Sequence, residues 1–140
     1  MKEPVFRYEN GHSTCIVEDA MGRKIIGEAW CSPEDKDFES VLMGSTIAEM
    51  RAQIAAAKMY RDDLKIKLLA LNQLLYSMNQ SQHFDPHSYQ AKMLYRQIRL
   101  IKDDLGIAKH QLAVLKLDLY EYINDKDALH QKLRKRRNEE

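Results

Sequence analysis

The sequence predicts an α+β fold that is predominantly α, in which a small three-stranded antiparallel β-meander precedes a long antiparallel helical hairpin of coiled-coil type. In residues 47–78 and again in residues 91–133, apolar side chains recur at alternating steps of three and four. This spacing is typical of helices that pack along a seam. The first 31 residues instead contain strand-forming runs separated by turn sequences, which indicates a sheet.

Three short runs rich in β-branched and aromatic residues predict the meander, at residues 5–8, 15–17 and 25–30. Between them lie Asn10-Gly11 and the segment 19–22, both of which have the composition of tight turns. A sheet this small is marginal alone, so we expect a helix to cover its apolar face. Either the first helix or the far end of the second could provide that cover.

The first helix is expected at about residues 37–79. Ser32-Pro33 and the carboxylates that follow have the features of a helix start, namely a hydroxyl cap, proline at the first position and negative charge near the positive end of the dipole. Gly44 leaves open that residues 33–43 form a separate turn. Only Arg61 interrupts the apolar seam, which consists of Ile47, Met50, Ile54, Ala57, Leu64, Leu68, Leu71, Leu75 and Met78.

A polar linker at residues 80–85 ends in Asp85-Pro86, where the second helix is expected to begin and to continue to about residue 136. The short linker favours an antiparallel hairpin, although a parallel dimer would use the same seam. We therefore assign the meander and helix start to residues 1–36 and the hairpin to residues 37–140. The second seam, interrupted by Lys126, consists of Ala91, Leu94, Ile98, Ile101, Leu105, Ala108, Leu112, Leu115, Leu119, Tyr122, Leu129 and Leu133.

A second apolar stripe recurs every seven residues beside this seam. A two-helix hairpin needs only a narrow stripe, and a wide one implies further helices. We therefore expect two chains to form a homodimer with a four-helix bundle, or a different protein to bind this face. Tyr89 and Tyr95 are candidate anchors, since tyrosine buries a large area at low entropic cost. The stripe consists of Met93, Leu100, Ile107 and Val114, with a weaker counterpart at Ala52, Met59 and Ile66.

The charges nearly cancel, with 22 lysines and arginines against 21 aspartates and glutamates. This balance argues against a dedicated duplex-DNA binder, so nucleic acid is a partner that the composition allows but does not favour. A basic surplus gathers at the C-terminus. There it could contact phosphates or an acidic protein surface, or only complement the negative pole of the helix dipole. It consists of Lys132, Arg134, Lys135, Arg136 and Arg137.

The sequence carries no motif for catalysis, a metal or a cofactor. His83 and His87 flank Asp85 at a spacing near that of metal ligands, but no cysteine is close by, and we assign no metal. The carboxylates of residues 34–39 gather where any helix start prefers negative charge. There is no phosphate-binding glycine loop, nucleophile elbow or catalytic triad pattern. The sequence therefore predicts a protein that is not an enzyme and needs no cofactor.

The cellular compartment is expected to be the cytoplasm, without membrane contact. No stretch approaches the roughly 20 apolar residues of a membrane span, and the charged N-terminus lacks the apolar core of a signal peptide. In the reducing cytosol, Cys15 and Cys31 are expected to be free thiols that pack as small hydrophobic side chains.

Part of the chain resembles a family of small bacteriophage and mobile-element proteins of Gram-positive bacteria. In these a β-hairpin leads into a Cys-x-Pro-x-Asp helix start, then Gly, Ile-Ala and Arg-Ala. The resemblance covers about residues 24–55, and the spacing before Gly44 departs from the usual form, so no functional residue is carried over. The matching residues are Gly27-Glu28-Ala29-Trp30-Cys31-Ser32-Pro33-Glu34-Asp35, Asp37-Phe38-Glu39, Gly44 and Ile47-Ala48-Glu49-Met50-Arg51-Ala52.

The resemblance implies a compact module that occupies a surface on a host protein, including CRISPR nucleases and other defence enzymes in the bacterial cytosol. We therefore expect a non-enzymatic protein-binding module that inhibits a host defence complex by steric occlusion. Two alternatives stay open. One is a nucleic-acid-associated accessory protein that uses the C-terminal basic run, and the other is a structural coiled-coil homodimer.

Overall fold

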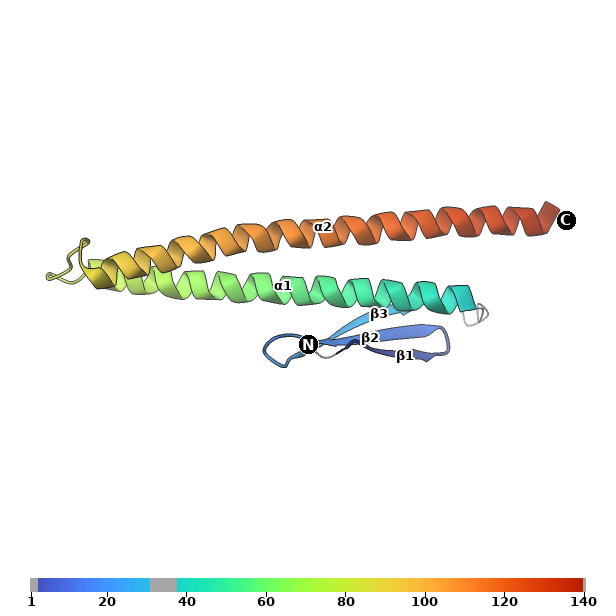
Figure 1. Cartoon of the computed structure of the whole chain (residues 1–140), viewed down its shortest axis with the longest axis horizontal. Helices are drawn as coiled ribbons and strands as arrows, with labels where there is room; N and C mark the ends of the chain where they lie inside the picture. Colours follow the sequence, from blue (N-terminus) through green and yellow to red (C-terminus); the bar gives the residue numbers. More distant parts are fainter. Residues whose placement is uncertain (1–2, 31–37, 140) are drawn as a thin grey trace. The chain divides into compact units, whose positions relative to one another are not determined.

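The computed structural model describes the backbone of residues 3–30 and 38–139 and the side chains of residues 3–30 and 40–126. Three strands precede two long helices (Figure 1), in the order β1 (Val5–Glu9), β2 (His12–Glu18), β3 (Lys24–Trp30), α1 (Phe38–Asn79) and α2 (Tyr89–Glu139). The predicted α+β, predominantly α class is confirmed.

The three strands form one antiparallel sheet in the order β1-β2-β3. Asn10 and Gly11, which join β1 to β2, have φ angles of 50° and 83°. Positive φ at both central residues is what a two-residue hairpin turn of type I′ requires, and Asn-Gly tolerates it. Asp19 organises the second turn, since its carboxylate accepts hydrogen bonds from the backbone nitrogens of Met21 and Arg23. The predicted meander and both of its turns are confirmed.

The N-terminal part of α1 covers one face of this sheet, so the first of the two expected covers is the one used. Along β3 buried and exposed residues alternate, as a strand with one covered face requires. The buried cluster joins Cys15 and Ala29 of the sheet to Ala48 and Ala52 of the helix, with Val17 and Ile47 against it. Assigning Ala52 to an exposed stripe was therefore wrong, because its side chain is fully buried beneath the sheet.

Helix α1 runs without interruption through Gly44, so the separate turn before the long helix does not form. Gly44 is buried, and a β-carbon at this position would lie 2.7 Å from the Ser13 hydroxyl oxygen. The absence of a side chain at Gly44 therefore allows the helix to contact the sheet closely. The helix start expected at residues 32–35 lies outside the described residues.

Helix α2 begins at Tyr89, three residues later than the Asp85-Pro86 pair suggests. The Asp85 carboxylate accepts a hydrogen bond from the backbone nitrogen of His87, and its carbonyl accepts one from that of Ser88. These bonds close a turn rather than a helix. The helix cap is Ser88, whose hydroxyl accepts a hydrogen bond from the backbone nitrogen of Ala91 at 3.2 Å.

The chain divides into two compact units, residues 1–56 with 113–140, and residues 57–112. The boundary expected between residues 36 and 37 falls outside the described residues. In the second unit the two helices pack through Leu64, Leu105 and Ala108, with Leu68 and Ile101 against them. Since higher numbers on one helix meet lower numbers on the other, the packing is antiparallel. The predicted seam is thus used within one chain, as a helical hairpin.

Candidate protein-binding surface

The α2 stripe, defined as Met93, Leu100, Ile107 and Val114, lies on a face of α2 separate from the seam. Leu100 is 47% exposed and Ile107 57%, whereas Leu105 between them is 9% exposed. Seven residues are nearly two full helical turns, so the four side chains lie in line. Met93 is half-buried, and Val114 is exposed. The stripe is an apolar surface that the described part of the hairpin does not use for its own packing.

The two tyrosines proposed as anchors lie on different faces. Tyr89, the first residue of α2, is four positions before Met93 and therefore shares the face of the α2 stripe. Tyr95 directly follows the buried Leu94 and lies on the flank of the seam instead. Both side chains are exposed, Tyr89 more than Tyr95. The structure thus brings only one of the pair onto the α2 stripe.

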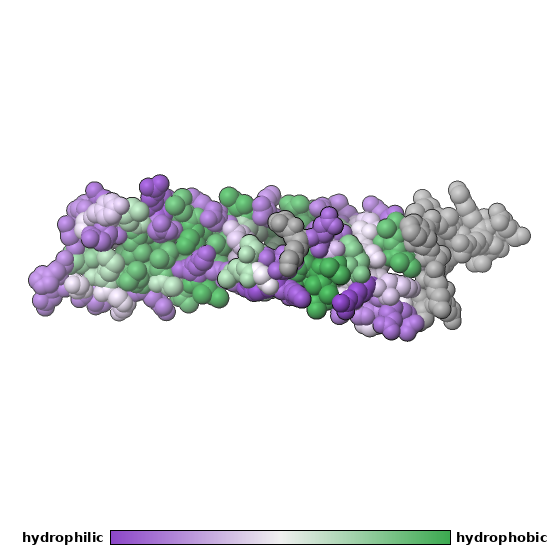
Figure 2. Space-filling model, turned by 60° about the horizontal axis from the view of Figure 1, so that its bottom comes forward, coloured by the Kyte–Doolittle hydropathy of each residue, from purple (hydrophilic) through white to green (hydrophobic). Residues whose placement is uncertain are grey.

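A second exposed apolar row, the α1 stripe, consists of Ile66, Leu69 and Tyr76. Sequence reasoning placed only Ile66 in an apolar stripe, and considered Tyr76 only as one of several helix tyrosines that could anchor a partner. All three are more than half exposed, whereas Leu64, two positions before Ile66, is buried. The sequence signal that could have identified this row is a second three-four spacing, through residues 59, 62, 66, 69, 73 and 76. Asp62 and Gln73 interrupt it, so the stronger seam obscures it. Figure 2 shows hydrophobic residues gathered over the left half of the view, with smaller hydrophobic areas to the right of its centre.

The outer face of the sheet carries an aromatic pair that sequence reasoning also missed. The rings of His12 and Trp30 stack with centroids 3.8 Å apart and planes within 8°. They are cross-strand partners in the β2–β3 register, and Glu28 Oε1 lies 3.7 Å from His12 Nε2. Cross-strand pairs of this kind stabilise a sheet. The pair accounts for one exposed aromatic residue without invoking a ligand.

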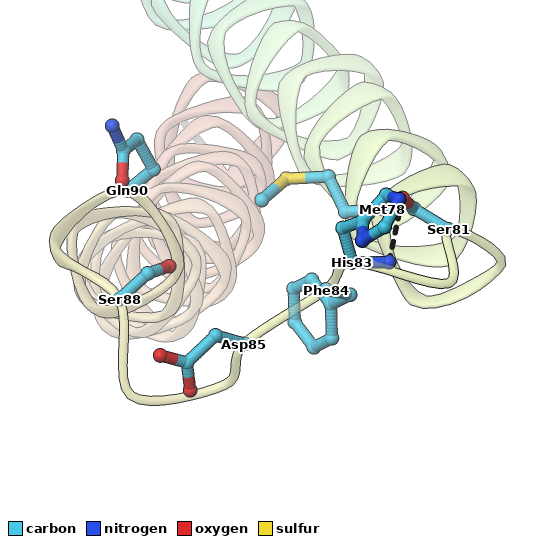
Figure 3. A pocket seen from close by; sticks show the side chains of 7 residues that line it. All are labelled: Met78, Ser81, His83, Phe84, Asp85, Ser88 and Gln90. Atoms are coloured by element: carbon cyan, nitrogen blue, oxygen red, sulfur yellow. Dashed lines mark hydrogen bonds between the residues drawn. The ribbon is translucent and has the colours of Figure 1, made fainter.

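The linker borders an open pocket of about 320 Å³ between the end of α1 and the start of α2 (Figure 3). Met78 and Phe84 face the same space, and the backbone nitrogen of His83 donates a hydrogen bond to the Ser81 hydroxyl. Within residues 3–30 and 40–126, no three histidine, cysteine, aspartate or glutamate side chains come together as a metal site. The pocket lining consists of Met78, Ser81, His83, Phe84, Asp85, Ser88 and Gln90.

Cys15 is a free, buried thiol in the contact between sheet and helix. Desolvation and, to a lesser degree, the Glu49 charge raise the pKa of this thiol. A raised pKa disfavours the reactive thiolate, so Cys15 behaves as a packing residue. Cys31 lies outside the described residues.

The basic run at the C-terminus belongs to the helical backbone of α2, which ends at Glu139. Its side chains lie outside the described residues. The run consists of Lys132, Arg134, Lys135, Arg136 and Arg137.

No protein family model, curated protein or solved structure matches this chain. In the part of the chain that the structure describes, neither helix contains a segment long and apolar enough to cross a membrane.

Proposed function

We propose that this chain is a non-enzymatic protein-binding module that receives an amphipathic helix along the α2 stripe. The observation that carries the proposal is the exposure of Leu100, Ile107 and Val114, each between 43% and 57%, at strict seven-residue spacing. A partner helix presents its own apolar side chains at the same spacing, so the two rows can interdigitate. Exposed apolar rows on soluble proteins commonly mark such binding sites.

Two sources of the partner helix fit this chemistry. A second copy of the chain would complete a four-helix bundle, because each hairpin supplies two helices. A helix of a host protein would be held in the same way. The further proposal, that the host protein is a defence enzyme such as a CRISPR nuclease and that binding blocks it sterically, is supported by the partial resemblance of residues 24–55 to phage proteins.

The test is a charged variant of the α2 stripe. In Leu100→Glu/Ile107→Glu, two carboxylates would have to be buried at the helix contact, which is strongly unfavourable. We expect this variant to lose association in sedimentation equilibrium while circular dichroism shows unchanged helicity. The matched control, Gln53→Glu/Asn72→Glu, adds the same charge at exposed positions of α1 and should associate like the parent chain. If the parent chain associates, unchanged association of the stripe variant would contradict the proposal.

The identity of the partner needs a separate measurement. If the parent chain sediments as a dimer that the stripe variant cannot form, the partner is a second copy. If the parent chain is a monomer, we expect it to inhibit cleavage by a host CRISPR nuclease, and the stripe variant to fail to do so. Undiminished cleavage in the presence of excess parent chain would contradict the inhibitor proposal. The C-terminal basic run remains an alternative for nucleic-acid binding, tested by truncation after Gln131.

A further inference from the structure

The charged residues of the unit at residues 57–112 are unevenly distributed around the hairpin. Six cationic side chains follow one side of the helix pair, and this set is called the basic flank. All six are exposed. The basic flank consists of Lys58, Lys65, Lys92, Arg99, Lys102 and Lys109.

The packing of the seam places lysines from both helices on the same flank. Lys65 directly follows Leu64 on α1, and Lys102 and Lys109 directly follow Ile101 and Ala108 on α2. Leu64, Ile101 and Ala108 belong to one buried cluster. In an antiparallel pair the two helices are related by a two-fold axis perpendicular to them, so equivalent positions beside the seam lie on the same side. Lysines more than 35 positions apart in the sequence therefore line one surface.

Lys92 and Arg99 extend this surface outward along α2. Together with Tyr95, Lys102 and Lys109, they follow a three-four spacing in which Gly106 occupies one position without a side chain, so they form a straight row on the helix. From Lys92 to Lys109 the row rises over roughly 25 Å, at 1.5 Å per residue. Tyr95, which is 42% exposed, lies within it. The row thus combines regularly spaced cations with one accessible aromatic ring.

Within residues 40–126, no salt bridge engages any member of the basic flank. Asp62 of α1 is the carboxylate next to the lysines of that helix, and it is already bound by Arg61 at 3.1 Å. On α2, Asp103 lies at the outer edge of the row and Asp104 on the opposite side. Cations three residues apart, such as Arg99 and Lys102, repel one another on a helix. A bound polyanion would relieve this repulsion.

We propose that the basic flank binds the phosphate backbone of a nucleic acid. A duplex presents one phosphate charge per roughly 1.7 Å of its axis, counting both strands, so about 15 phosphate charges lie along the roughly 25 Å that the row spans. Tyr95 can stack on an exposed base or sugar when the ligand is single-stranded. The near-neutral net charge of +1 concealed this site, because most of the balancing carboxylates lie elsewhere in the chain. The inference is independent of the protein-binding function proposed for the α2 stripe.

The test measures the salt dependence of binding in the full chain, with a fluorescein-labelled 24-base-pair DNA duplex and the matching single strand as probes. If five of the six cations contact phosphates, log K should fall against log salt with a slope of about −4.5 on the duplex. In Arg99→Gln/Lys102→Gln/Lys109→Gln we expect the slope to become shallower by up to about 2.7, since each phosphate contact contributes about 0.9. Circular dichroism verifies that the variant remains helical.

Two controls of equal charge separate this site from general electrostatics. Arg7→Gln/Lys24→Gln/Lys67→Gln removes three exposed cations outside the basic flank and should keep the slope of the parent chain. Arg134→Gln/Lys135→Gln/Arg136→Gln reports on the C-terminal run. A slope that becomes shallower only in the C-terminal variant, or equally in all three variants, would overturn the proposal.

The choice of probe identifies the ligand. Binding to either DNA form with the expected loss in the flank variant supports the proposal, and the tighter form shows whether duplex or single strand is preferred. Failure to bind both forms at 50 mM salt would overturn it. Competition by polyglutamate as effective as that by unlabelled DNA would also overturn it, and would assign the basic flank to an acidic protein.

Discussion

Gly27 of β3 lies directly against the backbone of Ala48 in α1, so closely that a β-carbon at position 27 would overlap the Ala48 carbonyl oxygen. The backbone nitrogen and Cα of Ala52 border the same point. Backbone atoms of a helix cannot rotate aside as a side chain can. The sheet therefore packs on α1 through small residues, and the contact depends on the absence of a side chain at Gly27.

The first prediction is that Gly27→Ala destabilises the fold. Adding one methyl group to a close-packed contact costs about 1 to 3 kcal/mol, and the rigid helix backbone at Ala48 places this site at the upper end, about 3 kcal/mol. Urea unfolding followed by circular dichroism measures the loss. A stability equal to that of the parent chain would show that sheet and helix are not packed this closely.

Gly106→Ala is the matched control for this glycine substitution. Gly106 lies inside α2, and a β-carbon there would meet nothing within 4 Å. The change should therefore stabilise the chain by about 0.8 to 1 kcal/mol, the difference in helix propensity between glycine and alanine. A loss of stability in Gly27→Ala together with a gain of stability in Gly106→Ala would distinguish a steric requirement from a general sensitivity to glycine replacement.

The elements of this fold could be predicted from the sequence because their signals are local. The three-four spacing identified both helices and the seam that includes Leu64 and Leu105, and the Asn10-Gly11 turn identified the first hairpin. The start of α2 was misplaced because two caps compete within four residues. Asp85 caps a turn and Ser88 caps the helix, and their chemistry is alike.

The contacts between elements could not be predicted in the same way. The face of α1 that meets the sheet carries Ala48 and Ala52, whose small side chains contribute little to a hydrophobic pattern. The basic flank depends on Lys65 and Lys102 lying on one side of an antiparallel pair. That relationship exists only after the direction of the second helix is known.

The second prediction concerns Ser13 and Gly44, which meet where β2 contacts α1. The Ser13 hydroxyl is buried without a hydrogen-bond partner among the described residues. Removing an unsatisfied buried hydroxyl in Ser13→Ala should therefore stabilise the chain by about 1 kcal/mol. Gly44→Ala alone should increase the stability of the chain only slightly, because its new methyl group would press on that hydroxyl, 2.7 Å away.

A double-mutant cycle tests this contact. In Ser13→Ala/Gly44→Ala the obstructing oxygen is absent, so the helix-propensity gain of about 1 kcal/mol at position 44 should be recovered. The double variant should then exceed the sum of the single variants by at least about 0.5 kcal/mol. Additive effects within experimental error would mean that the hydroxyl moves aside at no cost.

The third prediction is a loss of stability in acid that depends on Asp19. Partial desolvation acts to raise the pKa of this carboxyl, but hydrogen bonds from Arg23 and Met21 and the Arg23 charge together lower the pKa below its ordinary value of 3.8. The carboxylate therefore stabilises the fold above that ordinary value, and its contribution disappears as the pH falls through the lowered pKa. Asp19→Asn should reduce the urea midpoint at pH 6 and have little effect near pH 2. A constant difference across this range would contradict the assignment.

The fourth prediction compares two leucines five positions apart on α2. Leu105 lies in the buried cluster of the seam, so Leu105→Ala should cost about 2 to 4 kcal/mol through lost burial and the cavity left behind. Leu100 lies on the exposed α2 stripe, where truncation to alanine should change the stability of a monomer by less than about 0.5 kcal/mol.

Protein concentration distinguishes the two leucines further. If a second copy covers the α2 stripe, association stabilises the folded chain by mass action. The loss of unfolding free energy caused by Leu100→Ala should then grow as the protein concentration rises. The cost of Leu105→Ala arises within one hairpin and should change far less with concentration. Urea unfolding at two concentrations a hundredfold apart makes the comparison. Equal costs for the two variants at both concentrations would mean that Leu100 belongs to the internal packing of the hairpin and not to a surface for a partner.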